Sequence, residues 1–365
     1  MFIELHFLQS FVPSSLNRDD THMPKDCEFG GVRRARISSQ CLKRAIRLHP
    51  LFALHSGVAS SLRTRLMVNE LTERLMNAGK PETNSKEHAE EYARFYSSKK
   101  GKLDGTKTGV MLFLGMAELD EIVAELIKTE NWQNKKNIKN LAENFAKDTK
   151  KRSGAPDIAL FGRMLADRPE TNVDAACQVA HAISTHRVRT EVDFFTAIDD
   201  LNQGERSAGL IGVANFNSAC FYRYACIDFE QLLINLGDDV ELARKTVEAF
   251  LRASVAAVPS GKQNSFAAQN LPSFLMAVTR SDGMCWSLAN AFEQPIIAAQ
   301  DRGLLRPSIE KLDEYWGLMH KLYGGETHPV VALLEGDVEL SYLKDVRMES
   351  IEDWIKAIMS ALPGN

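Results

Sequence analysis

The sequence predicts an α+β fold in which one antiparallel sheet carries helices on one face. Three observations favour this class. The chain opens with a run of aromatic and β-branched residues, two extended runs surround a Gly-containing turn near Gly204, and amphipathic stretches of helical period separate the extended runs. Because 365 residues exceed what one small core holds, we expect two or three substructures.

The first 150 residues change character from strand to helix. Residues 2–11 are predicted to form a strand that enters the core at once, and residues 13–15 end it. A basic loop and a helix follow, and the helix stops before Pro50. Residues from 57 to about 150 have helical period, with loops rich in Gly, Lys and Asn, so we expect a helical insertion there.

The second half alternates between strands and helices. A helix is expected over residues 174–186. Residues 188–201 alternate loosely and residues 210–228 are rich in β-formers, so these runs should pair as a hairpin whose second run continues as a central strand. The remaining predicted elements are helices over 241–258, 287–293, 308–324 and 350–362, and strands over 273–279 and 328–334.

Composition bounds the class of protein. No apolar run reaches about 18 residues, so no transmembrane helix is indicated. The opening residues lack a basic n-region and a small-residue cleavage site, which argues against a secretory signal. The six cysteines are scattered without a CxxC pair, so we interpret them as reduced thiols in a cytoplasmic protein.

The stretch over residues 17–47 is the most informative. Between Glu28 and Glu70 the chain has no carboxylate, although its formal net charge is -4. The basicity is therefore local, as a phosphate-binding face requires. The residues that carry it are Arg33, Arg34, Arg36, Lys43, Arg44, Arg47, Arg63 and Arg65.

Three features of this stretch favour anion binding. Gly30-Gly31 would let backbone amides approach an anion, because no Cβ is in the way. Ser38 or Ser39 would cap the next helix, whose positive dipole end would point at the same place. On that helix Lys43, Arg44 and Arg47 would form one edge, with Cys41, Leu42 and Ile46 facing inward. The alternative is a solvated basic helix surface.

Other signals are weaker alone. Lys135, Lys136 and Lys139 stand near the start of a helix, where such a group is usually a solvated face. Met164, beside Gly162 and Arg163, could be a wedge against a base, although a lone Met more often fills a core.

No catalytic set is apparent. None of the nine histidines has metal-ligand spacing, and no hydrolase, kinase or dinucleotide motif occurs. We therefore expect neither catalysis nor a metal or cofactor. The alternative is an endoribonuclease that cleaves RNA without metal, using His6 or His22 with Lys25 as general acid and base.

Three segments carry a specific resemblance: SLNRDD at 15–20, KDCEFGG at 25–31 and RRARISSQCLKRA at 33–45. They resemble the backbone subunit of the type I-E CRISPR surveillance complex, Cascade, in the repeat-associated protein superfamily. The similarity continues through DIALFGRM, AHAISTH, VDFFTAIDDL, FYRYA, PSGKQNSFAAQNLP and SLANAFE. It covers most of the chain, and residues 57–134 match only loosely.

The resemblance implies a hand-like, non-catalytic, cytoplasmic RNA-binding protein. An RNA-recognition-motif-like (ferredoxin-like) palm would comprise residues 1–56, a connector at 179–189 and residues 216–365, with helical fingers at 57–178 and a thumb hairpin at 190–215. Copies would stack along the CRISPR guide RNA with other Cascade subunits and without a membrane. The thumb of one copy would displace a base from the RNA held by its neighbour, at regular intervals, and the exposed spacer would pair with target DNA.

The resemblance also implies residue roles. The RNA backbone would be held by Asn17, Arg18, Lys25, Arg34, Ser38, Gln40, Lys43, Arg44, Arg47 and Arg163. Met164 and Phe195 would flank the displaced base, although Phe194 stands where the family has Trp, so either ring could stack. Lys135, Lys136 and Lys139 would meet target DNA. Contacts to phosphate and sugar suit a guide whose sequence varies, because they carry no base information.

Overall fold

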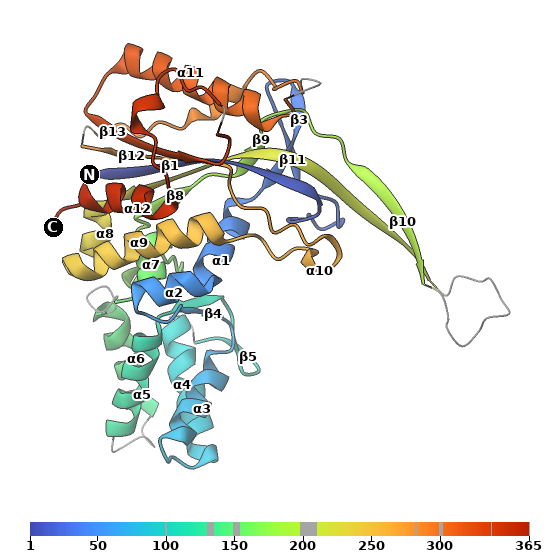
Figure 1. The fold of residues 1–365 in the computed structure, drawn as a ribbon. Helices are drawn as coiled ribbons and strands as arrows, with labels where there is room; N and C mark the ends of the chain where they lie inside the picture. Colours follow the sequence, from blue (N-terminus) through green and yellow to red (C-terminus); the bar gives the residue numbers. More distant parts are fainter. Residues whose placement is uncertain are drawn as a thin grey trace.

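The computed structural model describes residues 1–98, 101–129, 135–148, 154–197, 210–281, 283–298, 302–336 and 338–364. In this part of the chain a nine-stranded antiparallel sheet has the order β13–β12–β1–β11–β9–β3–β2, and β8 and β10 also pair with β11 (Figure 1). The strands are β1 (Phe2–Ser14), β2 (Asp26–Phe29), β3 (Val32–Ile37), β8 (Cys177–Val179), β9 (Ala182–Ser184), β10 (Glu191–Ala197), β11 (Leu210–Asp228), β12 (Phe274–Arg280) and β13 (Thr327–Leu333). The mixed α+β class is as predicted.

Helices cover both faces of the sheet, so the prediction that they lie on one face is wrong. On one side Ile3, Leu5 and Phe7 of β1 share a core with helices that include α9. On the other side Leu8 packs in a second core with Trp316. The first face carries α1 (Ser39–Leu48), α2 (Pro50–Ser56), α7 (Pro156–Phe161), α8 (Phe229–Asn235), α9 (Val240–Ala256) and α12 (Ile351–Ser360), and the second carries η3 (Leu288–Phe292) and α11 (Leu305–Tyr323). β1 is buried on both faces over most of its length, and such a strand lacks the regular apolar–polar alternation of a sheet covered on one face.

A separate helical body lies below the sheet in Figure 1. It consists of α3 (Met67–Asn77), α4 (Glu82–Ser97), α5 (Met116–Lys128) and α6 (Lys135–Asp148), with the short strands β4 (Leu62–Thr64), β5 (Leu103–Asp104), β6 (Lys107–Thr108) and β7 (Leu112–Leu114). Its core includes Leu71, Tyr92, Ile122 and Phe145. No helix in the described ranges has the length and apolar character needed to cross a membrane.

The predicted hairpin is confirmed, and its second strand does continue as a central strand. β10 pairs with the first part of β11 from Glu191↔Phe216 to Ala197↔Leu210. The rest of β11 lies between β1 and β9. The paired part projects well beyond the sheet (Figure 1). A Cβ at Gly212 would lie 2.2 Å from the ring of Phe195, so this glycine leaves the space that the ring occupies.

The helix predicted for residues 174–186 is wrong. This segment forms β8 and β9, and β9 is held between β11 and β3 through the pairs Tyr222↔Ile183 and Arg36↔Ile183. Short apolar runs do not distinguish a helix from a buried strand. Here the unpaired edges of β3 and β11 decide the outcome.

The Gly30-Gly31 pair also has a different role from the one predicted. It is the two-residue turn between β2 and β3, with φ of 60° and 72°. Positive φ at both positions is the signature of a tight hairpin turn. A Cβ on Gly30 would lie 1.8 Å from the carbonyl oxygen of Glu293, so glycine is required for packing as well. Nothing in this geometry directs the pair at an anion.

The remaining predicted elements occur near their expected positions. α9, β12, α11, β13 and α12 match the predictions, and the segment over 287–293 is the 3-10 helix η3. Three short helical turns complete the described chain: α10 (Gln263–Phe266), η2 (Pro169–Thr171) and η4 (Lys344–Val346).

Candidate nucleic-acid interface

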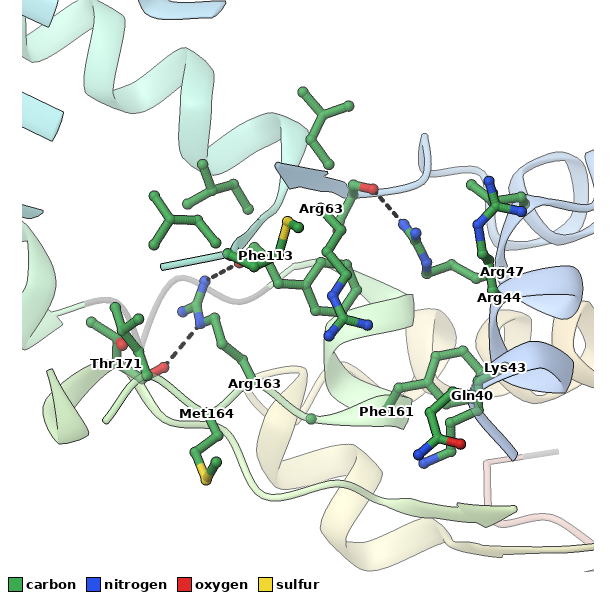
Figure 2. A pocket seen from close by; sticks show the side chains of 18 of the residues that line it. Gln40, Lys43, Arg44, Arg47, Arg63, Phe113, Phe161, Arg163, Met164 and Thr171 are labelled. Carbon is green, nitrogen blue, oxygen red and sulfur yellow. Dashed lines mark hydrogen bonds between the residues drawn. The ribbon is translucent and has the colours of Figure 1, made fainter. Parts of the chain in front are cut away.

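A pocket of about 830 Å³ lies where α1, the β4–β7 pair and the end of α7 meet (Figure 2). Eight residues predicted to bind RNA line it: Asn17, Ser38, Gln40, Lys43, Arg44, Arg47, Arg163 and Met164. They come from segments far apart in the chain, so the fold assembles them. The volume is in the range of protein ligand sites.

The start of α1 is fixed by side-chain caps. Ser38 Oγ accepts a hydrogen bond from the Cys41 amide at 3.3 Å, so Ser38 rather than Ser39 is the N-cap. Asn17 Oδ1 accepts from the Ser38 amide at 2.9 Å. Leu42 and Ile46 are buried as predicted. These contacts hold the helix so that Gln40, Lys43 and Arg44 border the pocket.

The pocket is strongly cationic. Five basic side chains line it, and none of the described residues in its wall is Asp or Glu. Two of the five, Arg47 and Arg163, are tied to buried carboxylates behind the wall. Lys43, Arg44 and Arg63 have no such carboxylate partner in the described part of the chain. Their charge therefore faces the cavity.

Arg47 is a structural member of this wall. Its Nη1 donates to the carbonyl oxygen of Ser61 at 2.6 Å and lies 3.6 Å from Asp157 Oδ2. Its guanidinium also lies 5.1 Å from the centre of the Phe113 ring. Burial lowers the pKa of Arg47, and the nearby Asp157 opposes that effect. The contacts tie α1 to α7 and β4, so Arg47 contributes charge to the pocket from a fixed position.

Arg163 and Met164 are neighbours with opposite placements. Arg163 is buried and donates to Thr171 O at 3.0 Å, Phe113 O at 3.1 Å and Glu118 Oε2 at 2.8 Å (Figure 2). Its Nε and Nη1 donors are used inside the protein, which limits the RNA contact predicted for Arg163. Met164 is 83% exposed at the rim of the pocket. Because Met164 is exposed, it does not fill the core, and its position is compatible with the predicted wedge against a base.

Arg34 is not in the pocket and is fully buried. Its guanidinium donates to the carbonyl oxygens of Phe29, Ser184, Phe292 and Glu293. The prediction that Arg34 holds RNA therefore conflicts with the structure. The side chain instead fastens β3 to β2, to β9 and to the end of η3.

The other predicted residues lie outside the pocket. Arg18 is exposed and Lys25 is half-buried in the loop next to Asn17. Phe195, 45% exposed, is on the projecting hairpin, so one chain does not bring it to Met164 (Figure 1). Lys136 and Lys139 are exposed on α6, with Lys139 Nζ 5.2 Å from the Phe95 ring centre. The side chain of Lys135 lies outside the described residues.

Two residues at this face were not identified as site residues from sequence. Arg63 lines the pocket, and only its place in the carboxylate-free stretch hinted at it. His181 Nδ1 accepts from the Ser39 amide at 3.2 Å and lies 3.4 Å from Arg36 Nη1. Burial, then the charges of Arg36 and Lys25, lower the pKa of His181. Because Nδ1 accepts from the Ser39 amide, a neutral ring carries its proton on Nε2.

The pocket suits polyanion binding, and of the two histidines considered for RNA cleavage only His22 is exposed. His6, a candidate for RNA cleavage, is fully buried, and its Nδ1 lies 2.9 Å from the hydroxyl of Tyr222. Burial, followed by the charge of Arg280, lowers the pKa of His6 to about 3. His6 therefore cannot reach a bound RNA strand. The described residues hold no group of three His, Cys, Asp or Glu side chains placed to bind a metal ion.

Comparison with known proteins agrees with the fold. A chain of a "CRISPR RNA-guided surveillance complex, pre-nicking" is 30% identical, with a TM-score of 0.87 over 99% of this chain and 100% of that chain. A chain of another "CRISPR RNA-guided surveillance complex" is 26% identical, with a TM-score of 0.77 over 99% of this chain and 100% of that chain. No curated protein sequence gives a significant match. The family model described as "CT1975-like protein" matches residues 3–360. Because that match spans nearly the whole sequence, the chain belongs to the family of CT1975-like proteins.

Proposed function

We propose that this protein is a non-catalytic guide-RNA-binding backbone subunit of a CRISPR surveillance complex. The single observation that carries the proposal is the pocket beside α1, where Lys43, Arg44 and Arg63 face a cavity without carboxylate partners in its described wall. Basic side chains that meet phosphates give affinity without sequence information, as a binder of variable guides needs. The full-length similarity to chains of surveillance complexes supports the same role.

The finer features follow from the resemblance. Copies would stack along the guide RNA in a type I-E complex in the cytoplasm, with other subunits alongside. The projecting hairpin of one copy would reach over the RNA that its neighbour holds and displace one base, with Phe195 or Phe194 and the neighbour's Met164 against it. The spacer would then pair with target DNA, which Lys135, Lys136 and Lys139 would approach.

The same proposal includes an RNA-recognition-motif-like unit. β1, β9, β11 and β12, with α1 and α9 in the connections, would form it. Its support is the strand order β12–β1–β11–β9. In chain order these elements follow the β-α-β-β-α-β pattern of that fold.

The test is a binding titration with single-stranded RNAs of equal length and unrelated sequence. Fluorescence anisotropy at several salt concentrations would give the affinity and its salt slope for each RNA. We expect similar affinities across sequences and a steep salt dependence. The variant Lys43→Ala/Arg44→Ala should weaken the binding of every RNA to the same degree.

Three results would contradict the proposal. Binding that depends strongly on base sequence would mean that bases rather than phosphates are read. Cleavage of the RNA in the presence of a chelator, visible on a denaturing gel, would favour the endoribonuclease instead. If the intact protein binds no RNA, either alone or within its co-expressed complex, the proposed function is wrong.

A further inference from the structure

The pocket has walls from two separate parts of the fold. α1 and the end of α7 belong to the region that packs on the sheet, whereas β4 and β7 belong to the helical body. β4 and β7 pair so that Arg63 lies opposite Phe113. In Figure 2 the Arg63 side chain extends from β4 past Phe113 into the cavity, between Arg163 and Phe161.

Arg63 differs from the nearby arginines in how its charge is used. Arg65 donates from Nε to Thr108 O at 2.8 Å and lies 3.7 Å from Asp104. Arg47 is held by Ser61 and Asp157. Arg63 is exposed, and within the described ranges no hydrogen bond or ion pair holds its guanidinium. Its donors are therefore available to a ligand.

The cations at this site are close enough to affect one another. The charges of Arg63 and Arg44 both lower the pKa of Arg47, although burial of Arg47 has the larger effect. Like charges held together across a partly enclosed cavity repel each other, and an anion between them removes that repulsion. A guanidinium offers two parallel N–H donors, which match the oxygens of a phosphate.

We propose that Arg63 is a phosphate ligand which, with Arg44 on the facing wall, clamps one phosphodiester group of the bound RNA. This inference rests on the proposed function and adds a residue, and a purpose, to the site. The RNA backbone would link the helical body to α1, which Arg47 otherwise joins to β4 through Ser61. Binding would then fix the two parts of the protein relative to each other.

The experiment compares Arg63→Ala and Arg63→Lys with Lys128→Ala. Lys128 is a suitable control because it carries the same charge at the end of α5, is 72% exposed, and has an ion pair only with Glu125 among the described residues. Binding to single-stranded RNA is titrated by anisotropy at several salt concentrations. Arg63→Ala should weaken binding by about tenfold or more and lower the salt slope by about 0.7. Lys128→Ala should bind like the wild type.

The other variants separate charge from geometry. Arg63→Lys should keep the salt slope but recover only part of the affinity, because the ammonium lacks the two-pronged donor. Arg63→Ala combined with Arg44→Ala should lose less than the product of the single losses, since both act on one phosphate. In hydrogen exchange, RNA should protect β4 and β7 in the wild type but not in Arg63→Ala, while α1 stays protected in both.

The outcomes distinguish this inference from the proposed function. If Arg63→Ala binds like Lys128→Ala while Lys43→Ala/Arg44→Ala loses affinity, the role of Arg63 is wrong and RNA binding stands. If the wild type binds no RNA, the proposed function itself fails. Arg63 is exposed, so its substitution should not change the melting temperature. Should Arg63→Ala nevertheless melt early, Arg63→Gln, which retains most of the side chain, provides the same comparison.

Discussion

Replacing Arg47 with Ala should destabilise the protein, whereas replacing its neighbour Arg44 should not. Arg47 belongs to the same basic edge of α1, but its side chain is only 11% exposed and lies against Asp157, which is 1% exposed. Removing one partner of a buried ion pair costs about 3–5 kcal/mol, because the other charge remains buried without compensation. Asp157 would keep hydrogen bonds from the Ser61 amide at 2.9 Å and the Ser61 hydroxyl at 2.5 Å. The cost should therefore be near the lower value, about 3 kcal/mol.

Urea denaturation followed by circular dichroism measures this loss as a shift of the unfolding midpoint. Arg44→Ala is the matched control, since it removes the same charge from the next turn of α1 and Arg44 is exposed. Arg47→Ala/Asp157→Ala should recover part of the loss, because no charge is then left unpaired. An Arg47→Ala protein that keeps the wild-type midpoint but binds RNA poorly would refute the reasoning and return Arg47 to the set of direct RNA ligands.

Three further predictions concern binding, the pocket rim and pH. Lys43→Ala/Arg44→Ala should lower the salt slope of RNA binding by at most about 1.4, which is about 0.7 per lost phosphate contact. The decrease should be the same for RNAs of unrelated sequence, and a loss of affinity confined to some sequences would contradict phosphate binding. Met164→Ala should change the free energy of unfolding by less than about 0.5 kcal/mol, because Met164 is 83% exposed, and a clear drop in melting temperature would reveal a packing role. Burial, with a smaller contribution from Arg280, lowers the pKa of His6 to about 3 from its ordinary value of 6.5. The unfolded state therefore binds more protons between these pH values, and stability falls as pH falls. From pH 7 to pH 5 this group should cost about 2 kcal/mol, and urea midpoints at both pH values should differ less in His6→Gln than in the wild type.

Much of the fold can be predicted because its signals are local. β1, the β10–β11 hairpin and α9 each consist of a run whose periodicity or residue type is specific. The helix predicted over residues 174–186 was wrong because the structure of this segment depends on contacts that are distant in the sequence. Its short apolar run is compatible with either state, and pairing with β11 and β3 makes it β8 and β9.

In the candidate site, too, contacts distant in the sequence decide what local sequence cannot, as two neighbouring arginines show. Arg33 and Arg34 are adjacent on β3, and successive residues of a strand face opposite sides. Arg33 is exposed and 3.2 Å from Asp26, whereas Arg34 is fully buried under Phe292 and Glu293. Sequence alone cannot tell which of two such residues is buried, because the covering segment comes from a distant part of the chain.

The sequence by itself determined that positive charge is concentrated over residues 33–65 and that Ser38 or Ser39 starts a helix carrying Lys43 and Arg44, because charge density and helix caps are properties of neighbouring residues. Only the tertiary structure decided which of those charges face a cavity. It placed Arg63 of the helical body beside α1 and turned the donors of Arg163 and Arg34 inward. The physical reason is that a buried charge needs partners, and the carboxylate and carbonyl groups that provide them are assembled only when distant segments pack together.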